Sequence, residues 1–386
     1  MKIPPPRDPT LDAVDQEIVR KNPPTQRYHL GASILGRECE RELWYGFRWT
    51  APSHFPASTL RKFEDGDACE PQMAGRLQAV PQIKLVTTTE NGDSQIRVQH
   101  FGGHLGGSMD GIIQGLLQAP KTWHVWEHKS TAEKGFRALK RCIDKHGEKD
   151  ALAAWNPTYY AQAQVYMGLT HTNDWNTPIK RHYMTVSTPG GRDFTSLRTE
   201  YDKGAFEEFT EKAERIINAV TPPDRISGDP DFYQCNWCTF KPNCHEGKTA
   251  QVSCRTCAHV TPKDDGRWHC SFHNKKLSAT AQRNACQDHI FIPELIPWAN
   301  VMEMDQEANS ISYRTPGGKD FKNTSPANFA QFEFTSKDLQ HCDADLLDGD
   351  GAFLVAAAVF EPTIVERKKK KKDPLPVWDD PLPDFL

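Results

Sequence analysis

Three cysteines lie close together in the second half of the chain, at Cys235, Cys238 and Cys244, in the spacing Cys-x2-Cys-x5-Cys. Clustered thiolates favour an iron-sulfur cluster or zinc, and a shared metal forces the segments that carry them to converge. A second group has different chemistry, because Asp110 precedes the segment Trp126–Ser130, which contains a glutamate and a lysine. Carboxylate and carbonyl oxygens favour Mg²⁺ or Mn²⁺. The sequence therefore predicts two kinds of metal centre in one chain.

Length and composition indicate a protein with a substantial hydrophobic core and no global basic surface. The chain has 386 residues, of which 25% are charged, and a formal net charge of -4. Any contact with nucleic acid must therefore come from a local groove. The segment 1–24 lacks an apolar signal region, and no run of about 18 apolar residues occurs, so we expect a cytosolic protein that makes no membrane contact.

Composition shifts divide the chain into five parts. Residues 1–30 are rich in proline and are expected to form a flexible arm. Residues 31–248 have the patterns of a mixed α/β domain, and residues 249–300 are rich in cysteine. Residues 301–365 are predicted to form a small α+β module, and residues 366–386 a disordered charged tail.

Apolar periodicity predicts the order of elements in the α/β domain. Helices are expected at residues 33–47, 59–80, 135–145, 157–168 and 203–220. Strands are expected within residues 83–113, and at residues 122–129, 180–187 and 192–199. Asn156 followed by Pro157 is a favourable helix start, which places Gln162 and Tyr166 one turn apart inside that helix.

The strand predicted at residues 122–129 carries the candidate reactive groups. Alternate side chains of a strand share a face, so Glu127 and Lys129 are expected to point the same way. Asp110 ends an earlier strand and would lie against Glu127 if the two strands pair. These two carboxylates and the main-chain carbonyl of His128 would hold Mg²⁺ or Mn²⁺, while Lys129 acts on the attacking water. Glu-x-Lys alone is a weak signal, because such triplets are frequent by chance.

The order of these elements resembles a known family. Asp110, then Glu127-His128-Lys129, then Gln162-x3-Tyr166 is similar to the PD-(D/E)xK nuclease superfamily, in its RecB-like exonuclease branch. The resemblance implies a restriction-endonuclease-like core, with a mixed central sheet flanked by helices. It also implies divalent-metal-dependent hydrolysis of DNA, in recombination, repair or replication. The proline of the family name is absent, since Ser108 and Met109 precede Asp110.

The same resemblance implies roles for further residues. Gly66-Asp67-Ala68-Cys69-Glu70 matches an upstream helical element of the branch, which makes Glu70 a third metal ligand. Gln162 and Tyr166 would contact the DNA backbone and help to hold the lysine. Two alternatives stay open: an endonuclease that nicks branched or single-stranded DNA, and a non-catalytic DNA-binding module with structural metals.

A fourth ligand for the first cysteine group is expected from Cys39. Its setting resembles the N-terminal cysteine helix of AddB-type helicase-nucleases and of the exonucleases associated with CRISPR spacer acquisition. By that resemblance, Cys39, Cys235, Cys238 and Cys244 would bind a 4Fe-4S cluster that clasps the two ends of the nuclease domain. Zinc at the same four sulfurs is the alternative, which spacing does not exclude.

A second cysteine set predicts a separate zinc-ribbon-like module. It consists of Cys254, Cys257, Cys270 and Cys286, with His269, His273 and His289 as possible replacements for a thiolate. Cysteines outside both sets are expected to be small buried hydrophobic residues. These are Cys69, Cys142 and Cys342.

The C-terminal tail combines a basic run with an acidic tip. Arg367 is followed by five lysines, and the tip from Trp378 ends in Phe385 and Leu386. The tip faintly resembles the acidic tail of bacterial single-strand-binding proteins. It is therefore a candidate for recruiting a replication or recombination partner, or for occupying the DNA groove until substrate arrives.

Overall fold

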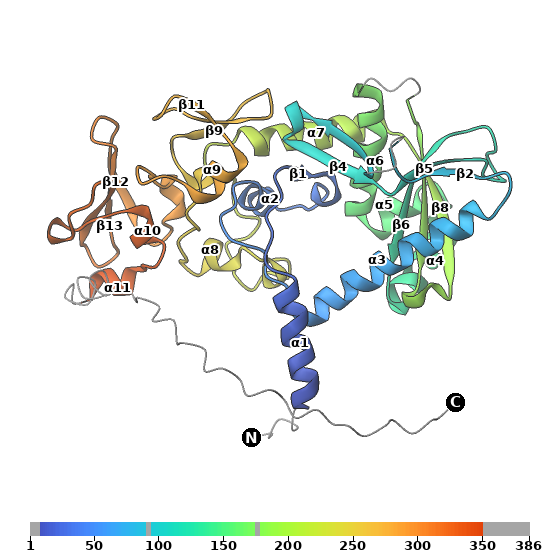
Figure 1. The fold of residues 1–386 in the computed structure, drawn as a ribbon, viewed down its shortest axis with the longest axis horizontal. Helices are drawn as coiled ribbons and strands as arrows, with labels where there is room; N and C mark the ends of the chain where they lie inside the picture. The colour runs from blue at the N-terminus through green and yellow to red at the C-terminus, as the bar shows by residue number, and fades with distance from the viewer. Residues whose placement is uncertain (1–7, 90–93, 174–177, 350–386) are drawn as a thin grey trace, which may run out of the picture.

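The computed structural model describes residues 8–89, 94–173 and 178–349, and its largest sheet lies at the centre of a mixed α/β fold (Figure 1). The five strands of this sheet have the order β2-β5-β6-β7-β8. β6 and β7 pair in parallel, and the other neighbours pair antiparallel, so the predicted mixed sheet is confirmed. The bounds are Lys84–Val86 for β2, Gly111–Gln114 for β5, His124–Ser130 for β6, Arg181–Ser187 for β7 and Phe194–Glu200 for β8.

The helices of this domain agree with most of the sequence expectations. Their bounds are Glu40–Phe47 for α2, Ala57–Gln78 for α3, Glu133–His146 for α4, Ala151–Trp155 for α5, Pro157–Thr172 for α6 and Lys203–Asn218 for α7. Two short helices of the described domain, α5 and α8 (Lys241–His245), were not predicted. The helix expected at residues 33–47 is instead a 3-10 turn, η1 (Ala32–Ile34), followed by α2, because Cys39 caps a new helix start.

Helices cover both faces of the central sheet. The C-terminal half of α3 packs on one face, where Met73 and Trp126 belong to one apolar cluster. On the other face, Phe136 and Leu139 of α4 pack with Met184 of β7. A strand covered on both sides has few solvated positions, which explains the nearly continuous burial of β6.

The connection from β6 to β7 runs through α4, α5 and α6, since parallel neighbours require a crossover. The last of these helices begins as predicted. The Asn156 side chain accepts hydrogen bonds from the N–H groups of Thr158 and Tyr159, both at 3.1 Å. This cap fixes the start of α6 and therefore which of its residues face β6.

A second, three-stranded sheet lies beside the first and has the order β1-β4-β3. Its strands are β1 (Leu30–Gly31), β3 (Ile96–His100) and β4 (Leu105–Met109). The chain passes from β4 into β5 of the central sheet across one residue, Asp110. The backbone therefore places this carboxylate at the junction of the two sheets.

The expectation of a flexible arm over residues 1–30 was wrong for α1 (Pro9–Lys21). Pro9 stands in the first helical turn, where proline is tolerated, and the Asp8 side chain accepts the N–H of Thr10 at 2.9 Å. The helix projects from the body and contacts α3 through the ion pair of Asp15 with Arg61 (Figure 1). Prolines that suggest disorder here begin a helix.

Two small modules follow the α/β domain; the first lies next to that domain, and the second lies at the end of the molecule farthest from the central sheet (Figure 1). The first contains an antiparallel sheet, β9 (Val260–Pro262), β10 (Trp268–Cys270) and β11 (Lys275–Leu277), and the helix α9 (Ala279–Asn284). The second lies where a small α+β module was expected, and the structure describes it as far as residue 349. It contains β12 (Asn300–Asp305), β13 (Ser310–Arg314), β14 (Asp320–Thr324), β15 (Glu333–Phe334), α10 (Ser336–Leu339) and α11 (Ala344–Asp348). The predicted charged tail lies outside the described residues.

A buried arginine connects the first module to the N-terminal segment. Arg255 is 1% exposed and donates hydrogen bonds to the main-chain carbonyls of Phe47 at 2.9 Å and Tyr28 at 3.0 Å. Its guanidinium carbon lies 3.8 Å from the ring centre of Trp49, a cation-π distance. Residues more than 200 positions apart are thereby held in one core.

No helix within the described parts of the chain combines the length and the apolar character that crossing a membrane would need.

Candidate active site

Strand pairing places Asp110 opposite Glu127. β5 and β6 are antiparallel with Gly111 beside Trp126, so the residues one step further, Asp110 and Glu127, are neighbours across the pair. The Asp110 Oδ2 atom also accepts a hydrogen bond from the backbone N–H of His128 at 2.8 Å. Burial raises the pKa of Asp110, although Lys129 and this hydrogen bond act against the rise. The carboxylate is thus held at the site by backbone geometry.

Glu127 is a buried glutamate, 2% exposed. One of its carboxylate oxygens accepts hydrogen bonds, and the other has no partner. The Oε1 atom accepts hydrogen bonds from Lys129 Nζ and, at 2.9 Å, from Gln162 Nε2. The Oε2 atom is buried and has no hydrogen-bond partner. Burial raises the pKa of Glu127 to about 8, and the charges of Asp110 and Glu70 add to the rise. A buried unpaired carboxylate oxygen is costly unless a cation or proton satisfies it.

Lys129 follows on the same face of β6 and forms an ion pair with Glu127. Its Nζ atom lies 5.4 Å from the ring centre of Tyr159 on α6. Burial by itself lowers the pKa of this lysine, but Glu127 and Asp110 outweigh burial, so the pKa lies above its ordinary value. The amine is therefore protonated at neutral pH and offers a fixed positive charge.

Glu70 reaches the same region from α3. Burial raises the pKa of Glu70 to about 7, with a further contribution from the charge of Asp110. The carboxylate oxygens of Glu70, Asp110 and Glu127 do not all lie within 4.8 Å of one another. The three acids are therefore close enough to affect one another's pKa, but they do not form a compact set of metal ligands.

Two side chains of α6 lie beneath the carboxylates. Gln162 and Tyr166 are 3% and 2% exposed, and Gln162 Nε2 lies 3.3 Å from Tyr166 Oη, which donates to the carbonyl of Ser108 at 2.8 Å. Gln162 contacts Glu127 and not Lys129, so it positions the glutamate. A Cβ atom on Gly107 would lie 2.6 Å from the Tyr166 ring, which explains why glycine stands there.

The ring of His128 faces the other side of β6. Its Nδ1 lies 3.0 Å from Thr185 Oγ1 and its Nε2 lies 3.2 Å from Ser187 Oγ. Burial lowers the pKa of His128 to about 4, so the ring is neutral. The backbone N–H of His128 contacts Asp110, whereas the imidazole faces away from the carboxylates. The use of the main-chain carbonyl as a metal ligand stays a prediction.

Tyr159 is the site residue that sequence reasoning missed. It precedes Gln162 by three residues, so the two lie on the same face of α6. That spacing was the signal that could have identified Tyr159. Its contact with Lys129 was not predictable, because helical periodicity shows which side of a helix a residue occupies but not which residue it contacts.

The first cysteine set lines one pocket. Cys39 caps α2, where its Sγ atom accepts the N–H of Glu42 at 3.4 Å, and Cys235, Cys238 and Cys244 lie around the short helix α8 (Lys241–His245). Burial raises the pKa of Cys238 to about 12. All four sulfurs border the same pocket, yet no three lie within 4.8 Å of one another. The structure thus gathers thiols without closing them into a coordination sphere.

The second cysteine set is gathered in the same way. Cys254, Cys257 and Cys270 are buried, and no three of the four sulfurs of this set lie within 4.8 Å of one another. Burial raises the pKa of Cys257 to about 12 and of Cys254 to about 11. From the sequence we expected all four thiolates to be ligands of one metal. In the structure, the fourth cysteine, Cys286, lies within 4.8 Å of two side chains that are not cysteines.

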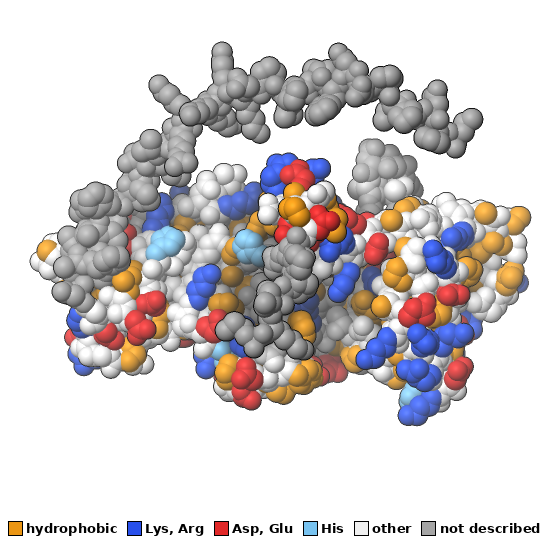
Figure 2. Space-filling view, turned by 90° about the horizontal axis from the view of Figure 1, so that it is seen from below, with side chains coloured by type: hydrophobic (Ala, Val, Ile, Leu, Met, Phe, Trp, Pro, Cys, Tyr) orange, Lys and Arg blue, Asp and Glu red, His pale blue; other side chains and the backbone are white. Residues whose placement is uncertain are grey.

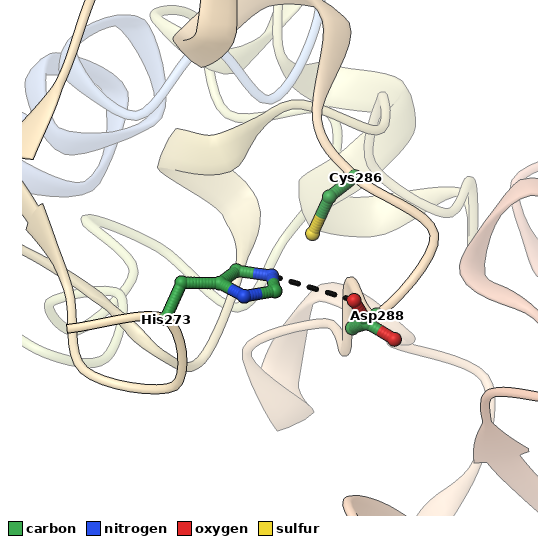
Figure 3. Close-up of side chains that lie close together, drawn as sticks. All are labelled: His273, Cys286 and Asp288. Atoms are coloured by element: carbon green, nitrogen blue, oxygen red, sulfur yellow. Dashed lines mark ion pairs between the residues drawn. The ribbon is translucent and has the colours of Figure 1, made fainter. Parts of the chain in front are cut away.

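Those side chains are His273 and Asp288 (Figure 3). Within the described residues, His273, Cys286 and Asp288 are the one set of three whose ligand atoms all lie within 4.8 Å. His273 Nε2 lies 3.3 Å from Asp288 Oδ2, and the backbone N–H of His273 donates to Cys270 Sγ at 3.5 Å. His273, which was expected from the sequence as a possible replacement for a thiolate, therefore lies beside two cysteines of the second set, Cys270 and Cys286.

Comparisons with known proteins do not identify a family. No family model matches the chain, and no curated protein matches it. Among solved structures, SSO0001 is 14% identical with a TM-score of 0.33, over 61% of this chain and 96% of that one. An alkaline exonuclease from Laribacter hongkongensis, LHK-Exo, is 15% identical with a TM-score of 0.33, over 52% of this chain and 90% of that one. The structure of LHK-Exo in complex with dAMP is 15% identical with a TM-score of 0.33, over 49% of this chain and 85% of that one. Likeness at this level assigns neither fold nor activity.

Proposed function

We propose that this chain is a divalent-metal-dependent deoxyribonuclease that hydrolyses phosphodiester bonds. The observation that carries the proposal is the state of Glu127: buried, opposite Asp110, held on one oxygen by Lys129 and Gln162, and unpaired on the other. Hard oxygen donors beside a fixed ammonium suit a Mg²⁺ or Mn²⁺ ion that receives a phosphate. The motif resemblance favours an exonuclease among such enzymes, acting in recombination, repair or replication.

The chain's own residues would divide the work in the following way. Asp110, Glu127, Glu70 and the carbonyl of His128 would hold the ion, which supplies Lewis-acid activation of water and phosphate. Lys129, already protonated, would orient the water through a hydrogen bond and stabilise charge that develops on the phosphate. Gln162 and Tyr166 would keep Glu127 in place from below.

We also propose structural metals for the two cysteine sets. One pocket is lined by four cysteines, Cys39, Cys235, Cys238 and Cys244, and four thiolates suit a 4Fe-4S cluster. Cys254, Cys257, Cys270 and Cys286 would hold zinc. Iron content and brown colour after anaerobic purification, with one zinc ion per chain, would support both assignments. Zinc without iron would show that the first set holds zinc.

The proposed activity is tested with the full chain and end-labelled single- and double-stranded DNA in Mn²⁺. We expect cleavage that EDTA abolishes, and loss of about a hundredfold or more of the rate in Asp110→Asn, because the ion loses a ligand. The matched control is Asp264→Asn, at an exposed aspartate of the first small module, and this variant should cleave like the unaltered protein. Cleavage that persists undiminished in Asp110→Asn would refute the site.

A further inference from the structure

The solvent face of α4 carries a stripe of positive charge. Lys134, Arg137, Arg141 and Lys145 follow one another at intervals of three, four and four residues, and all are exposed. Residues at these intervals lie along one side of a helix. The opposite side is occupied by Phe136 and Leu139, which pack on the central sheet, so the stripe faces outward.

The stripe is a concentrated feature on the molecular surface. Figure 2 shows Lys and Arg side chains gathered at the lower right, on the part of the molecule where Figure 1 places α4. Within the described residues, Lys134, Arg141 and Lys145 form no ion pair, and Arg137 has only an exposed contact of 3.8 Å with Glu133. Unpaired cations in a chain of net charge -4 are available to an external anion.

The position of α4 relates the stripe to the candidate active site. α4 begins four residues after Lys129, and Lys134 lies five residues after it. Because consecutive Cα atoms are about 3.8 Å apart, the Cα atoms of these two lysines lie within about 19 Å. From there the stripe extends about 17 Å along the helix, at about 1.5 Å per residue.

The candidate active site offers little attraction to nucleic acid by itself. The Lys129 ammonium is already paired with the Glu127 carboxyl group, beside Asp110 and Glu70, so it is not free to bind a phosphate before a metal ion binds. Attraction must therefore come from outside the site. A row of cations spaced by about one helical turn, about 5.4 Å, presents one charge per step to a flexible phosphate backbone.

We propose that this stripe on α4 is a tracking surface for the phosphate backbone of single-stranded nucleic acid, leading to or from the catalytic carboxylates. The proposal rests on the proposed nuclease function and names the surface that holds the substrate. It requires backbone contacts without base recognition, so binding should depend on salt and not on sequence.

The test compares two triple variants of the full chain that remove equal charge. The stripe variant is Lys134→Gln, Arg141→Gln and Lys145→Gln. The control variant is Lys263→Gln, Lys322→Gln and Lys337→Gln, three exposed lysines of the two small modules that form no ion pair among the described residues. Circular dichroism establishes that both fold. Binding of a fluorescent single-stranded 20-mer of mixed sequence is measured by anisotropy in EDTA, over a range of NaCl concentrations.

We expect the stripe variant to bind at least tenfold more weakly at low salt. Its slope of log affinity against log salt should be shallower by about 2, since each single-strand phosphate contact contributes about 0.7. The control variant should match the unaltered protein. An unchanged slope in the stripe variant, or an equal loss in both variants, would overturn the proposal.

Cleavage in Mn²⁺ separates this proposal from the nuclease function. Binding that depends on the stripe without any cleavage would support the surface and refute the enzyme. Cleavage with stripe-independent binding would do the reverse. A protein that neither binds nor cleaves the strand would refute both.

Discussion

At the scale of single residues, the site depends on a carboxylate withheld from water. Glu127 receives an ammonium and an amide on one oxygen, and its other oxygen has no partner. Leaving such an atom buried costs about 1 to 3 kcal/mol or more, which a bound cation would recover. The protein thus keeps an unsatisfied carboxylate oxygen where the proposed metal ion would bind.

The raised pKa values of Glu127 and Glu70 predict pH-dependent metal binding. Glu127 has a pKa of about 8 and Glu70 of about 7, both raised first by burial. A cation binds the deprotonated carboxylates, so binding releases protons below these values. Mn²⁺ affinity should rise about tenfold per pH unit between pH 7 and 8, and more steeply below pH 7.

Calorimetric titration of the metal-free protein with Mn²⁺ from pH 6 to 8.5 measures this dependence. Without metal, the same shifts have the opposite effect on folding: the folded pKa values exceed the unfolded ones, so stability should fall as pH rises through 7 and 8. An affinity for Mn²⁺ that stays constant over this range would contradict the burial of the two acids.

The sequence predicted which of these residues share a site, and the reasons are local. Period-two alternation places Glu127 and Lys129 on one face of β6, and the antiparallel pairing of β5 with β6 brings Asp110 opposite Glu127. The partner of Gln162 was not predictable, because helical spacing fixes a direction and not a contact. The long-range packing of α6 against β6 decides that it reaches the glutamate.

At the scale of elements, helix ends supply the thiols of the first cysteine set. Cys39 is the N-cap of α2, and the other three sulfurs lie around α8, about 200 residues later in the sequence. A cluster at this pocket would connect the two ends of the α/β domain. The two ends of the domain would then be joined by metal-thiolate bonds and not only by packing between helices.

Replacing Cys39→Ser separates the two roles of this residue. Serine is a good N-cap, so α2 should keep its start, while the metal loses a ligand. We expect iron content to fall from about four atoms per chain to well under one, with loss of visible absorbance. Cys142→Ser, at a half-buried cysteine outside both sets, is the control and should keep its iron. Full iron content in Cys39→Ser would exclude this residue as a ligand.

The helices α1 and α5 were not predicted, because the local sequence pattern of each was misleading or too short. α1 forms because Asp8 and Pro9 suit a helix start, although neighbouring prolines suggested a flexible arm. α5 spans only Ala151–Trp155, too short to show a helical period, and its packing against α4 and α6 stabilises it. The long elements, α3 and α6, were predictable because their patterns extend over several turns.

At the scale of the whole molecule, Arg255 connects the cysteine-rich module to the α/β domain. Its guanidinium satisfies the carbonyls of Phe47 and Tyr28 and the side chain of Gln282, among aromatic rings. Burial lowers its pKa to about 9, so the charge is kept at neutral pH. No sequence pattern predicts this contact, because Arg255 lies more than 200 residues from Phe47 and Tyr28 in the sequence and meets them only in the folded chain.

Replacing Arg255→Met should therefore destabilise the protein by about 3 kcal/mol or more, because buried carbonyls lose their donors. Urea unfolding, followed by tryptophan fluorescence, measures the loss. Arg267→Met, at a side chain that is 63% exposed, serves as the control and should change stability by less than about 0.5 kcal/mol. Equal midpoints for the two variants would show that the modules do not depend on this contact.

The central claim is that Lys129 acts beside a metal held by Asp110 and Glu127, and single-turnover cleavage of end-labelled DNA by Lys129→Ala tests it most directly. The account predicts a rate at least about a hundredfold lower in Mn²⁺, with unchanged iron and zinc content and an unaffected Lys322→Ala control. Cleavage by Lys129→Ala at the rate of the unaltered protein would contradict it.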